Sequence, residues 1–173
     1  MLGLTPLGVI HTAISLVALA SGALALVRHL EISPANRLGR IYVWATVLTC
    51  ITGFGIFQHG GFGKPHALGV ITLLVLGLAA LATRRRVFGN ASPCVATVSY
   101  SATLFFHMVP GLTETFTRLP LGAPLFSGPE DPALQKAVGA CFLVFIAGAA
   151  LQIRRLRGMR SQTAAAAGQG AGS

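Results

Sequence analysis

Five long intervals without a charged side chain constrain this sequence more than any other feature. They cover residues 1–27, 41–63, 65–83, 87–113 and 137–153, with lengths of 27, 23, 19, 27 and 17 residues. A helix that crosses the hydrocarbon core of a bilayer needs about 20 apolar residues, within a range of roughly 17–25. The mean hydropathy is +0.72, and 10% of the residues are charged, against about 25% in ordinary soluble domains. The sequence therefore predicts a polytopic membrane protein.

The charge-free intervals predict an all-α bundle of five transmembrane helices that forms one membrane domain over residues 1–160. Residues 1–27 lack a basic start and are too apolar for too long to be a cleaved signal peptide, so they count as a span. The tail 161–173 is rich in small and polar residues, which is typical of a disordered chain end. We expect the helices at about 5–27, 40–59, 65–83, 93–118 and 134–153.

Arginine is distributed unevenly between the two predicted sides of the membrane. Ten of the thirteen basic residues, all arginines, fall in the segments 28–40, 84–86 and 154–160. The positive-inside rule assigns this side to the cytoplasm, so the N-terminus is expected outside and the C-terminus inside. This asymmetry accounts for most of the net charge of +9, and the short clusters do not resemble a nucleic-acid-binding surface. We expect the lipid bilayer, other membrane subunits or further copies of this chain as partners, and no nucleic acid.

The five histidines are the residues that point most directly to a function. Four of them fall near the outer ends of four successive predicted helices, within roughly 10 Å of one depth at a rise of about 1.5 Å per residue. Ionisable side chains are costly in hydrocarbon and often mark functional sites. We therefore expect the first four helices to form a histidine-bearing core, with the fifth helix peripheral. The four residues are His11, His59, His66 and His107.

Helical spacing groups each of these histidines with mostly small or hydroxylated residues on one face. On the second helix the face that contains His59 comprises Gly55, Thr52, Leu48 and Ala45. Small and hydroxylated residues also serve close packing between membrane helices, so the histidines carry the functional signal.

Three interpretations of the histidine cluster stay open. In the first, a b-type haem lies between His107 and one of His11 or His66, with imidazole nitrogens as axial ligands. In the second, a copper or zinc ion is bound by His11, His59, His66 and His107 together with Glu114. In the third, the protein binds no cofactor, and the histidines serve packing or respond to pH.

The sequence contains no H-E-x-x-H, P-loop or dinucleotide fingerprint, so catalytic residues are not predicted and enzymatic activity is left open. The most concrete expectation is a small membrane redox or cofactor-binding protein. The alternative is an accessory or structural membrane subunit without a cofactor of its own. Glu114 stands four residues before Arg118, which is the favourable order for a plain helical ion pair.

Two short motifs carry a family resemblance. Residues 37–44 (RLGRIYVW) and 63–66 (GKPH) resemble a group of uncharacterised bacterial membrane proteins that is catalogued as a domain of unknown function. In that group a histidine often precedes the first motif, where this chain has Asn36. The resemblance covers roughly residues 5–80. It implies a multi-pass protein of the bacterial inner membrane and no defined activity.

The histidine pattern on a four-helix core is also similar to b561-type haem electron carriers. Those proteins have a second histidine pair near the other membrane face, where this chain has only His29. This second resemblance therefore implies at most one haem, near the outer face.

Overall fold

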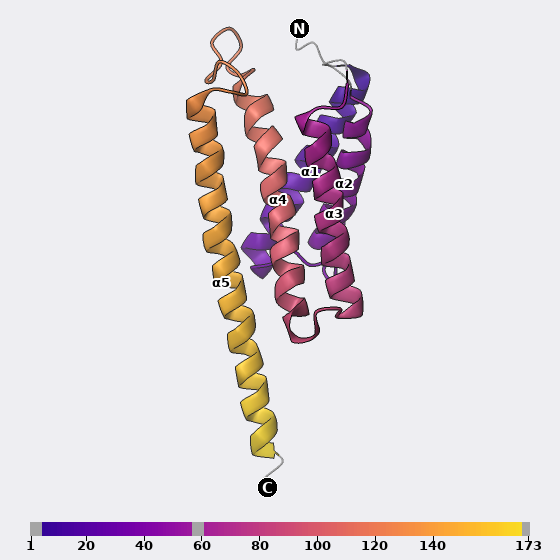
Figure 1. Cartoon of the computed structure of the whole chain (residues 1–173), viewed down its shortest axis with the longest axis vertical. Helices are drawn as coiled ribbons and strands as arrows, with labels where there is room; N and C mark the ends of the chain where they lie inside the picture. The colour runs from indigo at the N-terminus through magenta and orange to yellow at the C-terminus, as the bar shows by residue number, and fades with distance from the viewer. Residues whose placement is uncertain (1–4, 57–60, 171–173) are drawn as a thin grey trace.

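The computed structural model describes residues 5–56 and 61–170, and this part of the chain is helical and contains no strand. The helices form an elongated bundle in which α5 lies along the outside of α4 (Figure 1). The predicted all-α class is thereby confirmed. The elements are α1 (Pro6–His29), α2 (Arg37–Phe54), α3 (Lys64–Arg85), the short 3-10 helix η1 (Gly89–Ala91), α4 (Ser92–Phe116) and α5 (Pro132–Gly170).

Four of the helices are long and apolar enough to cross a membrane. They are α1, α3, α4 together with η1, and the part of α5 from Pro132 to Thr163. Helix α2 is shorter, at 18 residues, and begins with Arg37 and Arg40. The prediction of several helices long and apolar enough to cross a membrane is therefore confirmed for these four, while the crossing by α2 stays a prediction.

Contacts between distant segments define the two ends of the bundle. At one end, Lys64 Nζ lies 2.8 Å from Glu130 Oε1, which joins the start of α3 to the loop before α5. At the other end, Arg155 and Arg160 donate hydrogen bonds to the backbone carbonyls of residues 29 and 90. Helices α1 to α4 each run between these two ends. The arginine-rich segments 28–40, 84–86 and 154–160 all gather at the second, which we call the arginine end.

The connection between α1 and α2 shows why glycine stands in the first family-like motif. Asn36 caps α2, because its Oδ1 accepts a 2.8 Å hydrogen bond from the backbone N–H of Gly39. A Cβ at Gly39 would lie 1.9 Å from the carbonyl oxygen of Ser33. Only glycine therefore allows the loop to fold back this closely onto the first turn of α2.

The core is built mainly from small side chains, which let the helix backbones approach closely. Tyr42 and Tyr100 are the two aromatic residues of this cluster, and Tyr42 is fully buried. The buried alanines are Ala18 and Ala25 on α1, Ala45 on α2, Ala79 and Ala82 on α3, and Ala96 on α4.

Two helix ends differ from the expected boundaries. The sequence predicts that the last helix ends near 153 and that 161–173 is disordered, whereas α5 continues to Gly170; residues 171–173 lie outside the described part. Alanine has the highest helix propensity, so the four alanines at 164–167 favour this continuation. The second helix, expected to reach residue 59, ends at Phe54 in a turn at Gly55.

Candidate functional site on helix α2

Polar side chains of the bundle interior gather on one side of α2. Tyr42 and Thr46 are fully buried, and Thr49 is nearly so. Positions 42, 46 and 49 share one helical face, and Thr52 follows at the edge of it. We call these four residues the α2 polar face.

The first half of the α2 polar face contacts α4. The Tyr42 hydroxyl lies 2.8 Å from Thr103 Oγ1, and His107 Nε2 lies 3.2 Å from Thr46 Oγ1. Because the Thr103 hydroxyl already donates to the carbonyl of Tyr100, at 2.8 Å, Tyr42 must be the donor in its bond to Thr103. The Tyr42 and His107 rings meet edge to face, with centroids 6.2 Å apart.

The second half of the α2 polar face contacts α1. His11 Nδ1 lies 3.0 Å from Thr52 Oγ1. The Thr52 hydroxyl donates to the carbonyl of Leu48, at 2.8 Å, so it accepts from His11 and fixes the proton on Nδ1 of that ring. Gly53 makes room for the imidazole, since a Cβ there would lie 3.2 Å from His11 Cε1. Each of the two histidines thus joins a different helix to α2.

The other predicted site residues lie elsewhere. His66 belongs to the first turn of α3, where its Nδ1 accepts a 3.2 Å hydrogen bond from the backbone N–H of Gly63 and its ring stacks on Phe62. Glu114 is exposed and forms the ion pair with Arg118 that the spacing predicts. His59 lies outside the described residues.

The described residues contain no group of three or more His, Cys, Asp or Glu side chains that could hold a metal ion. His11 and His107 bind α2 from two different helices. Their threonine partners, however, are six positions apart on α2, which is about 9 Å along the helix axis. What the arrangement achieves directly is a set of hydrogen bonds that joins α1, α2 and α4 inside the bundle.

The face predicted for α2 from the spacing to His59 is only partly the inward one. Ala45 is buried and Thr52 binds His11, but Leu48 is 47% exposed, and the fully or nearly buried polar residues are Tyr42, Thr46 and Thr49. The signal that would have found them is the spacing of four and three between polar residues in an otherwise apolar helix.

A second buried polar contact attaches α5 to the rest of the bundle. Gln152 is 9% exposed. Its Oε1 accepts a 3.0 Å hydrogen bond from the Ser101 hydroxyl on α4, and its Nε2 donates one of the same length to the carbonyl of Leu30 after α1. A single amide in α5 therefore contacts two other parts of the bundle.

No protein-family model, curated protein or solved structure matches this chain. The resemblances to the uncharacterised bacterial membrane proteins and to the b561-type carriers stay predictions.

Proposed function

We propose that this protein is an accessory or structural subunit of a complex in the bacterial inner membrane, in which histidines inside the bundle hold helices together. The observation that carries the proposal is that His11 and His107, on different helices, each use a ring nitrogen to bind a threonine of the α2 polar face. Interhelical hydrogen bonds of this kind stabilise membrane bundles.

We propose five crossings, with the N-terminus outside and the C-terminus in the cytoplasm. Helix α2 connects the arginine end of the bundle to the end that carries Lys64 and Glu130, which supports its role as a span. The gathering of ten arginines at one end supports a cytoplasmic assignment for that end. A phosphatase reporter active only in the periplasm should be active when inserted in the loop 119–131 and inactive at the C-terminus. The reverse pattern would overturn the orientation.

The experiment that tests the functional proposal is an optical spectrum of the purified protein, oxidised and dithionite-reduced, with metal analysis on the same sample. We expect neither a Soret band nor stoichiometric metal. The variant His107→Gln should lower the free energy of unfolding, because the Thr46 contact is lost or weakened. His29→Gln is the matched control, because His29 is exposed at the arginine end, and we expect it to unfold like the natural protein.

The second candidate is a small redox protein with a haem or a copper or zinc ion. The observation that favours it is that two imidazoles, those of His11 and His107, reach α2 from two different helices. A haem between them would be held by ring nitrogens of His11 and His107 as axial ligands. A Soret band that shifts on reduction and is lost in His107→Ala, or stoichiometric copper or zinc, would replace the accessory-subunit proposal with this one.

A further inference from the structure

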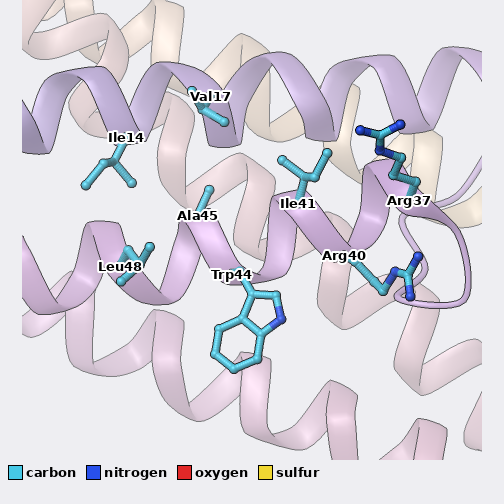
Figure 2. Close-up of a pocket in the computed structure, with 8 residues that line it drawn as sticks. All are labelled: Ile14, Val17, Arg37, Arg40, Ile41, Trp44, Ala45 and Leu48. Carbon is cyan, nitrogen blue, oxygen red and sulfur yellow. The ribbon is translucent and has the colours of Figure 1, made fainter.

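A groove of about 510 Å³ runs along the outer surface of α1 and α2. Figure 2 shows the two helices side by side, with aliphatic side chains along the groove and two arginines at one end of it. Trp44 projects outward from α2 in the same view and is 68% exposed. The lining residues are Ile14 and Val17 from α1 and Arg37, Arg40, Ile41, Trp44, Ala45 and Leu48 from α2.

The two arginines give one end of the groove a positive charge that no ion pair among the described residues neutralises. Arg37 and Arg40 are exposed and one helical turn apart at the start of α2. In Figure 2 the Arg37 side chain extends toward α1 and the Arg40 side chain away from it. Both ion pairs found among the described residues involve other basic groups, Lys64 and Arg118. The N-terminus of α2 adds the positive end of the helix dipole to the same place.

The arginines lie where the headgroup of a membrane lipid would lie, and the apolar walls of the groove lie where its acyl chain would lie. The arginines lie at the arginine end of the bundle, where the membrane-crossing segments begin and end. Trp44 follows Arg40 by about 6 Å along the helix axis, at a depth where tryptophan commonly meets the interface. The aliphatic walls then continue toward the middle of the bundle through Ala45, Leu48 and Ile14.

We propose that this groove binds an anionic phospholipid, with the phosphate at Arg37 and Arg40 and one acyl chain along the aliphatic walls. Guanidinium groups bind phosphate oxygens in pairs, which makes arginine the residue suited to this contact. Basic residues next to a membrane-spanning segment also attract anionic lipids. A free phosphate would use the arginines alone and would leave the apolar part of the groove without a role. The proposal does not depend on what His11 and His107 do, but it rests on the proposed crossing of the membrane by α2.

The test uses the full chain, purified in detergent and stripped of lipid, with lipid binding followed by native mass spectrometry. Phosphatidylglycerol is the anionic probe and phosphatidylcholine the zwitterionic one. We expect phosphatidylglycerol to bind more tightly, and the double variant Arg37→Gln/Arg40→Gln to weaken its binding about 30-fold. The matched control is Arg84→Gln/Arg85→Gln, which removes the same charge from the end of α3 without touching the groove, and we expect it to bind phosphatidylglycerol nearly as the natural protein does.

A second pair of variants tests the apolar part of the groove. Val17→Trp places a large ring in the groove and should reduce phosphatidylglycerol binding while the arginines stay intact. Leu16→Trp is its control, because Leu16 is 60% exposed on the same helix and does not line the groove. We expect this control to leave lipid binding unchanged, which also guards against a general effect of tryptophan on folding.

Three results would overturn the proposal. Equal affinity for the two lipids would mean that the headgroup charge is not recognised. Competition by inorganic phosphate at the same concentration, without an effect of Val17→Trp, would mean that the site takes a free anion only. A dimer that Val17→Trp dissociates, with no bound lipid, would assign the groove to a second copy of this chain.

Discussion

The hydroxyl of Tyr42 donates a 2.8 Å hydrogen bond to Thr103, and both residues are fully buried. The bond joins α2 to α4 across 61 positions of the sequence. On its other side the Tyr42 ring lies directly against Gly22 of α1, where a Cβ would come within 2.7 Å of the ring. Tyr42 therefore connects three helices through one side chain.

The first prediction concerns the loss of the Tyr42 hydroxyl. Tyr42→Phe keeps the ring but loses the bond to Thr103, whose own hydroxyl keeps its backbone partner Tyr100. We expect the free energy of unfolding to fall by about 1 kcal/mol, measured by denaturant unfolding in detergent. Tyr100→Phe is the control, because the Tyr100 hydroxyl forms no hydrogen bond with the described residues. An equal loss in both variants would contradict the role of the Tyr42–Thr103 bond.

The second prediction concerns a methyl group added at Gly22, where α1 lies against the Tyr42 ring. Gly22→Ala forces the Tyr42 ring away from α1, and overpacking of this kind costs roughly 1–3 kcal/mol. Gly77→Ala is the matched control, because no atom of the described chain comes within 4 Å of a Cβ there. Thermal unfolding should show a lower midpoint for Gly22→Ala and an unchanged or higher one for Gly77→Ala, since alanine favours the helix. If Gly22→Ala were as stable as Gly77→Ala, the close approach of α1 to Tyr42 would be wrong.

The positions of the helices could be predicted because charges interrupt the apolar sequence at their ends. The helix expected at 65–83 is observed as Lys64–Arg85, and the one expected at 93–118 as Ser92–Phe116. In a soluble bundle an apolar stripe also reveals how each helix is rotated. A membrane helix is apolar toward the lipid and toward its neighbours, so that stripe is absent.

The rotation of α2 and the partners of the histidines were therefore not predictable from apolar pattern alone. His11 and His107 are predicted to face inward, and both contact α2 inside the bundle, but the apolar pattern does not identify the threonines that they bind. His66 was grouped with them by depth, yet it contacts the start of its own helix. Depth follows from counting residues, whereas the direction of a side chain depends on how the helices pack.

The third prediction concerns the attachment of α5. Gln152→Leu loses the hydrogen bonds to Ser101 and to the carbonyl of Leu30, which should cost about 1 kcal/mol. We expect faster hydrogen exchange along α5, measured by mass spectrometry, with little change in α1 and α2. Gln135→Leu makes the same substitution at an exposed position of the same helix and should leave the exchange of α5 unchanged. Uniformly faster exchange over the whole bundle would contradict a local role for Gln152.

The fourth prediction concerns the ion pair at the end of the bundle opposite the arginines. Lys64 Nζ donates a 2.8 Å hydrogen bond to Glu130, and the bond together with the positive charge lowers the pKa of Glu130 below its ordinary value. A lowered pKa in the folded state means that the pair stabilises the fold above the ordinary carboxyl pKa. This contribution is lost as the pH falls through the lowered value.

Because both side chains are exposed, the stabilisation is small and is weakened further by salt. The sensitive measurement is therefore the titration of Glu130 itself, followed through its carboxyl carbon by NMR. In Lys64→Gln the pKa of Glu130 should rise toward its ordinary value, and high salt should produce a rise in the same direction in the natural protein. Lys136→Gln removes a lysine that forms no ion pair within the described chain, and it should shift the pKa of Glu130 much less. If Lys64→Gln left the titration unchanged, the contact between the start of α3 and the loop before α5 would not exist in solution, and the assignment of both to one end of the bundle would lose its main support.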